Sequence, residues 1–188
     1  MRISHFPRAI FALFGGLFIT FSQSHAAVIG LSVFIAYALL TAVGSFIIDS
    51  RAGQKKFLAL SIVNLVGGLL ALVAFIQSGG FSTDWYAVAQ SGETFSPATS
   101  QQGLFLTIVA GWAIVIGGIE IYLASKEGFG ERSGRDFLIR SFFSLALAAL
   151  FLLVTPDVVS SVGFFGAYLI LLGVHWAIAA FGEGKKLG

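Results

Sequence analysis

The amino-acid sequence predicts an all-α membrane protein with six transmembrane helices. Hydrophobic residues make up 57% of the 188 residues and charged residues only 11%, whereas charged residues are about 25% of an ordinary soluble domain. The apolar residues also fall into runs close to the ~20 residues that a helix needs to cross a bilayer core. These runs are 9–21, 28–48, 57–76, 103–124, 137–154 and 158–181.

The last two runs form the clearest unit of the chain. The first of them is followed by Thr155, Pro156 and Asp157, and the second begins directly afterwards. Proline and aspartate between two apolar runs mark a turn that a helix does not continue through. We therefore expect a helical hairpin here, and we expect the rest of the chain to consist of looser copies of it.

The first apolar run has two interpretations. It is preceded by Arg2 and Arg8 and followed by small residues near Ala26, which is also the pattern of a secretory signal peptide. We expect it to form the first helix of the protein. Residues 1–188 are then one transmembrane domain.

The basic residues predict the orientation of the helices in the membrane. If successive helices alternate in direction, one side receives the N-terminus, the loops 49–56 and 125–136 with Arg140, and the C-terminus. These segments contain all 11 lysines and arginines, and the long loop 77–102 on the other side contains none. Because lysine and arginine are enriched on the cytoplasmic side, both termini are predicted to be cytoplasmic. The pI near 9.1 therefore indicates contact with the membrane surface and not with nucleic acid.

An internal repeat of three helical hairpins, 8–48, 57–125 and 137–181, is also predicted. Pairs of small residues recur in the first helix of each hairpin, and glycines seven residues apart recur in the second helix of the last two. Small residues let membrane helices approach closely, so these glycines are expected to pack helix against helix. The usual richness of membrane helices in small and apolar residues is the alternative explanation. The predicted packing glycines are Gly15, Gly16, Gly67, Gly68, Gly118 and Gly173.

The hairpins resemble the HdeD/DUF308 family of small bacterial membrane proteins. The shared features are an apolar helix, a turn of the Thr155-Pro156 type and a second helix with spaced glycines, and the resemblance is greatest over 138–181. Family members often carry an aspartate just before a glycine of the second helix, but Gly117 and Leu172 occupy those positions here. The resemblance implies six helices in a bacterial inner (plasma) membrane and a link to acid resistance.

Ionisable residues within the membrane are the candidate functional residues, because placing them in hydrocarbon is costly. Glu120 lies two residues after Gly118, and His175 lies two residues after Gly173. With a rise of about 1.5 Å per residue, both lie within roughly 10 Å of the cytoplasmic boundary, and Asn64 lies at a similar depth. We therefore predict an intramembrane polar layer of Glu120, His175 and Asn64. A carboxylate beside an imidazole could pass protons or sense pH.

A purely structural interpretation of the same residues stays open. Glu120 could extend its carboxylate to the membrane surface, and His175 and Asn64 could serve only to hydrogen-bond neighbouring helices. Ser61, Ser144 and Arg140 fall in or near the same layer.

The sequence predicts no enzyme. It contains no cysteine, which excludes a thiolate nucleophile and a thiolate metal site. No spacing indicates a Ser-His-Asp set or a metal site, so no catalytic residue, metal or cofactor is expected.

We expect a non-enzymatic integral membrane protein with a function in acid or envelope stress. The alternatives are a small proton-linked transporter or channel, and an accessory subunit that packs on a larger membrane complex through some of its 20 phenylalanines. The expected partners are the lipid bilayer and either further copies of the chain or a larger membrane complex.

Overall fold

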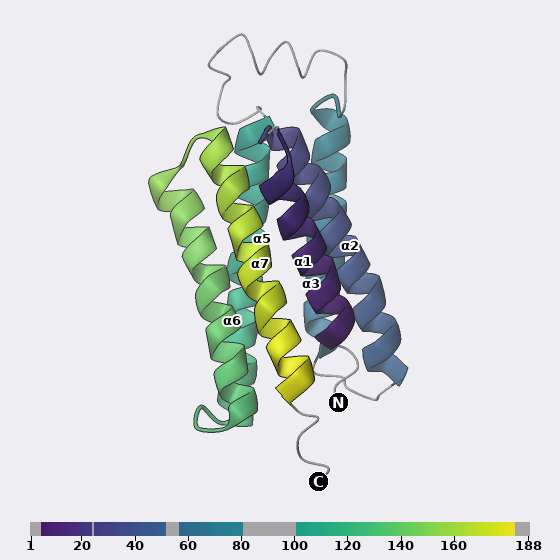
Figure 1. Ribbon diagram of the computed structural model, residues 1–188, viewed down its shortest axis with the longest axis vertical. Helices are drawn as coiled ribbons and strands as arrows, with labels where there is room; N and C mark the ends of the chain where they lie inside the picture. The colour runs from purple at the N-terminus through teal and green to yellow at the C-terminus, as the bar shows by residue number, and fades with distance from the viewer. Residues whose placement is uncertain (1–4, 24, 52–56, 81–100, 183–188) are drawn as a thin grey trace.

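A computed structural model describes residues 5–23, 25–51, 57–80 and 101–182. These residues form a bundle of helices that run along its long axis (Figure 1). The helices are α1 (His5–Phe21), α2 (Ala27–Arg51), α3 (Leu58–Gln77), α5 (Gln101–Glu127), α6 (Arg132–Ala149) with a π-helical continuation η2 (Leu150–Val154), and α7 (Val158–Gly182). The predicted all-α class is confirmed for this part of the chain.

Five of these helices are long and apolar enough to cross a membrane: α2, α3, α5, α6 with η2, and α7. Helix α1 is also apolar but has only 17 residues, which corresponds to about 25 Å at 1.5 Å per residue. The hydrocarbon core is about 30 Å thick, so α1 is at the short end of the range for a spanning helix. The chain has the character of a multi-pass membrane protein, and the count of six transmembrane helices stays a prediction.

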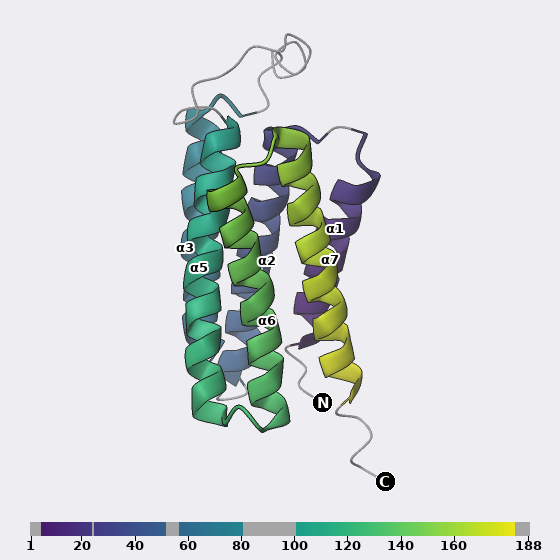
Figure 2. The ribbon, with the colours of Figure 1, turned by 90° about the vertical axis from the view of Figure 1, so that its left-hand side faces the viewer.

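The helices alternate in direction along the chain. The start of α1, the end of α2, the turn between α5 and α6 and the end of α7 all lie at one end of the bundle (Figures 1 and 2). The predicted basic segments therefore lie together as far as they are described. Much of the predicted loop 77–102 and part of the loop 49–56 fall outside the described residues.

Several helices extend further than their apolar runs. Helix α1 begins at His5 and α2 ends at Arg51, so Arg8 and Asp49 are helical and do not lie in flanking loops. The bilayer is about 40–45 Å thick when its headgroup regions are included. A helix that is longer than its apolar run can therefore continue from the hydrocarbon core into the headgroup region. The charged loop 125–136 is likewise shorter than predicted, because α5 continues to Glu127 and α6 begins at Arg132. Gly128 directly follows α5 and has a positive φ of 93°, which favours glycine at the end of a helix.

The predicted turn between the last two helices is confirmed. Thr155 has a left-handed backbone with φ 44°, and Pro156 follows it. Asp157 then caps α7: its Oδ1 accepts a hydrogen bond from the Ser160 backbone N–H at 3.1 Å, and its Oδ2 accepts one from the Ser160 hydroxyl at 2.6 Å. These hydrogen bonds stabilise the carboxylate and hold the pKa of Asp157 below its usual value.

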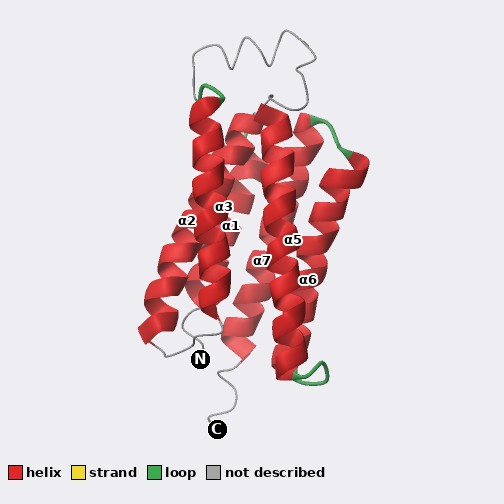
Figure 3. Cartoon of the chain, turned by 180° about the vertical axis from the view of Figure 1, so that it is seen from behind, coloured by secondary structure: helices red, strands yellow, loops and turns green. Residues whose placement is uncertain are grey.

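The closest helix pairs do not coincide with the three predicted hairpins. Helix α1 packs most extensively against α7, α2 against α3, and α5 against α6. The first and last helices thus lie side by side and close the bundle (Figure 2), and the view from behind shows α5 in front of α6 (Figure 3). The sequence repeat stays a prediction, but its hairpins are not the main packing units.

Glycines allow the close approach of α1 and α7. A Cβ added to Gly16 would lie 2.8 Å from the carbonyl oxygen of Gly166, and one added to Gly173 would lie 2.7 Å from Leu13. Both distances are too short for real atoms, so the two helices approach closely only because these residues are glycine. A Cβ on Gly15 would meet Val33 at 3.1 Å, a tight contact with α2.

Helices α3 and α5 also use glycine, although not at every predicted position. A Cβ on Gly67 would lie 2.8 Å from Trp112, and one on Gly68 would lie 2.8 Å from Leu39. In contrast, nothing lies within 4 Å of a Cβ on Gly118, so the prediction that this glycine packs helices is wrong for the described chain. The neighbouring Gly117 packs against α6 instead, because a Cβ on Gly117 would lie 2.8 Å from Leu145. The face of α5 that meets α6 is therefore one residue away from the predicted one.

Candidate functional site

A buried ion pair joins α1 to α2 near the end of the bundle where α1 begins. Arg8 donates through Nη2 to Asp49 Oδ2 at 2.6 Å and through Nε to Ser45 Oγ at 2.7 Å. The residues Arg8 and Asp49 are each only 3% exposed. Because α1 and α2 are antiparallel, the first turns of one helix lie beside the last turns of the other, which brings these two side chains together.

A second buried ion pair joins α5 to α6. The Nε of Arg140 donates to Glu120 Oε1 at 2.8 Å, and both residues are 3% exposed or less. Glu120 therefore does not extend to the membrane surface, which was the structural alternative for this residue. We call Arg8, Asp49, Glu120 and Arg140 the charge network.

Trp176 of α7 lies against both arginines of the charge network. The guanidinium carbon of Arg8 is 5.1 Å from the centroid of the Trp176 ring, and that of Arg140 is 4.1 Å away. Phe57 and Phe137 lie against the same two guanidinium groups, at 4.9 and 4.5 Å. Such cation–π contacts are each worth about 2 kcal/mol when desolvated. Through Trp176, α7 contacts both ion pairs.

The charge network is balanced, with two guanidinium groups and two carboxylates. Charges that are removed from water are tolerated only when they are paired and hydrogen-bonded. The hydrogen-bonding capacity of the network is not fully used, however: Arg8 Nη1 and Glu120 Oε2 are buried and have no hydrogen-bond partner in the described part of the chain.

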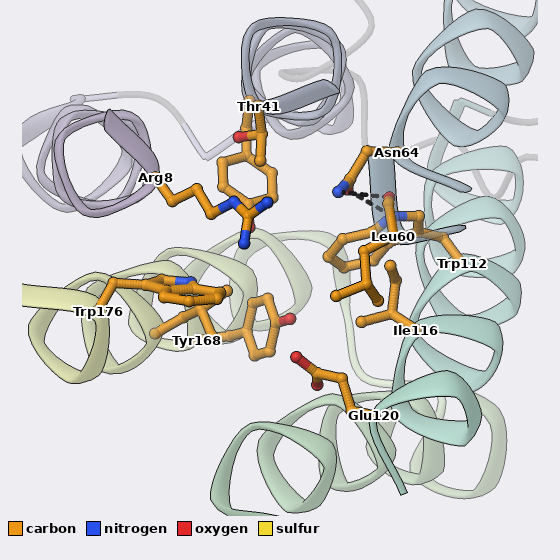
Figure 4. Close-up of a pocket in the computed structure, with 11 residues that line it drawn as sticks. Arg8, Thr41, Leu60, Asn64, Trp112, Ile116, Glu120, Tyr168 and Trp176 are labelled. Carbon is orange, nitrogen blue, oxygen red and sulfur yellow. Dashed lines mark hydrogen bonds between the residues drawn. The ribbon is translucent and has the colours of Figure 1, made fainter. Parts of the chain in front are cut away.

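A cavity of about 30 Å³ lies beside the charge network. Figure 4 shows that Arg8 and Glu120 both direct their charged groups toward it. The other polar side chains of its wall include Tyr37 and Thr41 from α2 and Tyr168 from α7. A cavity of about 10–15 Å³ is enough for one water molecule, so this cavity has room for one or two.

The structure brings two of the three predicted polar residues to this cavity. Glu120 and Asn64 both line it. The Oδ1 of Asn64 accepts a hydrogen bond from Trp112 Nε1 at 3.1 Å, and this bond connects α3 to α5. His175 is half-buried, is not part of the cavity wall and lies beside Asp136. The carboxylate of Glu120 is therefore paired with the guanidinium group of Arg140 instead of an imidazole, and within the described residues His175 is linked to this pair only through its electrostatic interaction with Arg140.

The remaining residues of the predicted layer have local roles. Ser144 of α6 and Tyr168 of α7 share a hydrogen bond of 3.1 Å between their hydroxyl groups. Ser61 donates to the carbonyl oxygen of Phe57 within the same helix turn. Arg140, which the sequence placed only near the layer, is a full member of the charge network.

Sequence reasoning did not identify Arg8 and Asp49 as site residues. Charged residues at the ends of apolar runs usually lie among lipid headgroups, so both were assigned to the flanks. The available signal was that Asp49 directly adjoins an apolar run, at the same depth as an arginine on the preceding antiparallel helix. That signal is weak without knowledge of which helix faces point inward.

Fold and site together define a multi-pass membrane protein with a buried charge network. Comparison of the chain with protein-family models, with curated proteins and with solved structures gave no match. The resemblance to the HdeD/DUF308 family therefore depends on the sequence features themselves. Within the described ranges, no three histidine or acidic side chains are grouped in a way that could hold a metal ion.

Proposed function

We propose that this protein is a non-enzymatic membrane protein of the bacterial inner membrane that responds to protons, in the manner of an acid- or envelope-stress protein of the HdeD type. The observation that carries the proposal is the charge network: two carboxylates buried among apolar helices, each paired with one arginine. The proposal includes cytoplasmic termini, which the positive-inside rule supports because the described basic segments share one end of the bundle.

Protonation of a carboxylate changes the balance of this network. A neutral Glu120 would leave Arg140 as a buried cation without its partner, and the loss of one partner from a buried ion pair costs about 3–5 kcal/mol. Proton uptake and helix packing are therefore coupled. The charged and titratable groups that face Glu120 from other helices are Arg140 of α6, Arg8 of α1, Tyr37 of α2 and Tyr168 of α7.

Trp176 provides a route by which a change at one ion pair reaches the other. Its indole contacts both guanidinium groups, so a shift of Arg140 alters the surface on which Arg8 packs. Because Trp176 belongs to α7, and α7 packs closely along α1, the response would involve the helices that close the bundle.

The size of the cavity favours a response to protons over the transport of a solute. A volume of about 30 Å³ admits water but no metabolite. A proton channel is the second candidate. The same observation supports it, because the buried carboxylate of Glu120 borders a cavity that has room for water.

Infrared difference spectroscopy of the protein in liposomes tests the proposal. A step to acidic pH is expected to produce a C=O band from buried protonated carboxyl groups, and the part of this band that comes from Glu120 should be absent in Glu120→Gln. Glu131→Gln is the matched control, because Glu131 is exposed beside the start of α6 and its substitution should leave the band in place.

Proton flux in the same liposomes separates the two candidates. No flux above that of empty liposomes, together with the Glu120 band, supports a protein that responds to protons without conducting them. Flux that Glu120→Gln abolishes would establish the channel instead. A spectrum without any Glu120-dependent band down to the pH at which the protein unfolds would refute both.

A further inference from the structure

We infer that the cavity beside the charge network is a binding site for one or two water molecules, held by Arg8 Nη1, Thr41 Oγ1 and Glu120 Oε2. This inference concerns the site itself and does not rest on the proposed function. Three independent features support it: the unused hydrogen-bonding capacity of its wall, the balance of charge across it and its size.

Three polar side chains of the cavity wall carry an atom with unused hydrogen-bonding capacity. Arg8 Nη1, Thr41 Oγ1 and Glu120 Oε2 are buried and have no hydrogen-bond partner among the described residues. All three residues are 3% exposed and all three line the cavity. Leaving such groups unpaired is costly, which is why buried polar groups nearly always have a protein or water partner.

The charges on the wall select a neutral ligand. Arg8 presents a donor with positive charge and Glu120 an acceptor with negative charge, and Figure 4 shows both groups directed toward the space between the helices. An ion of either sign would be attracted by one of these two groups and repelled by the other, so neither a cation nor an anion gains a net attraction. A molecule that both donates and accepts hydrogen bonds satisfies the two groups at once, and Thr41 can act as either donor or acceptor.

The volume of the cavity then restricts the ligand to water. About 30 Å³ accommodates one or two water molecules, and such a water molecule needs two to four polar partners. The three atoms provide that number. A water molecule in this position would join Glu120 to Arg8 and so connect the two ion pairs into one hydrogen-bonded network.

A crystal structure of the full chain in a lipidic phase, at a resolution that shows ordered water, tests the inference. We expect density for a water oxygen within about 3.2 Å of at least two of the three atoms. Soaking with bromide should give no anomalous signal at this position. A bromide peak there, or a cavity closed by repacked side chains, would overturn the inference.

Thr41→Val supplies a second test, because it removes one hydrogen-bonding group at nearly constant volume. Magnetisation transfer from water to the methyl groups of Ile116 and Leu172, which line the cavity, should be present in the wild type and reduced in Thr41→Val. The matched control is Thr20→Val, since the Thr20 hydroxyl is bound to the carbonyl oxygen of Gly16 away from the cavity and its removal should leave the transfer unchanged. Absence of transfer in the folded wild-type protein would refute the water site.

Discussion

The pair between Glu120 and Arg140 permits a quantitative prediction for the substitution Arg140→Met. Methionine keeps much of the aliphatic volume of arginine but removes the donor that lies 2.8 Å from Glu120 Oε1. Both residues are buried, so the variant leaves Glu120 as a buried charge without its partner. We expect the free energy of unfolding to fall by about 3–5 kcal/mol, the usual cost of removing one member of a buried ion pair. The loss of the cation–π contacts of Arg140 with Phe137 and Trp176 is included in this decrease of the free energy of unfolding.

The double variant with Glu120→Met and Arg140→Met separates the ion pair from the loss of packing. It contains no uncompensated charge, and apolar replacement of a whole buried ion pair is often neutral or stabilising. We therefore expect the double variant to be more stable than Arg140→Met alone. The free energies can be measured by unfolding in mixed micelles, followed by circular dichroism.

The control for this experiment is Arg135→Met. Arg135 is exposed on the same helix, and surface substitutions usually change stability by no more than about 0.5 kcal/mol. If Arg140→Met were no more destabilising than Arg135→Met, the ion pair would contribute nothing. The single variant Glu120→Met completes the comparison. If the destabilisation of the double variant equalled the sum of those of Arg140→Met and Glu120→Met, the two residues would not be coupled.

Two further predictions follow from the helix contacts and the turn. Gly16→Ala should destabilise the protein by about 1–3 kcal/mol, because its Cβ would overlap the backbone of α7 at Gly166. Gly111→Ala is the control, because a Cβ at Gly111 meets nothing within 4 Å. This substitution should be neutral or should stabilise the protein by up to about 1 kcal/mol. Equal effects of the two substitutions in the unfolding assay would contradict the close contact between α1 and α7. The second prediction concerns Asp157, whose pKa is lowered by the hydrogen bonds from Ser160. Its carboxylate stabilises the folded state at pH values above the pKa of aspartate in the unfolded chain. This stabilisation is lost as the pH falls through the lower pKa that Asp157 has in the folded protein. Asp157→Asn keeps a helix-capping group and should remove this pH dependence, so unfolding curves of wild type and variant that respond identically to acid would exclude the effect.

The sequence by itself predicted the class of the protein and the approximate position of its helices. Composition and the length of the apolar runs suffice for this, because the backbone polar groups of a chain in lipid must be satisfied within helices or closed barrels. The turn at Thr155, Pro156 and Asp157 was predicted for an equally local reason, since proline and a capping aspartate act on their immediate neighbours. The depth of Glu120 and Asn64 along their helices was also predicted from residue number, whereas their burial was not.

Only the tertiary structure decided which polar residues meet. Depth along a helix is readable from residue number, but the direction of a side chain around the helix depends on which neighbour each face packs against. Glu120 is therefore paired with Arg140, while His175, at a similar depth, lies beside Asp136. The pairing of Arg8 with Asp49 required the helices to extend beyond their apolar runs, and the contact of both arginines with Trp176 required α7 to lie beside α1. These contacts join residues far apart in the chain, so their free energy belongs to the packed bundle and leaves no local pattern in the sequence.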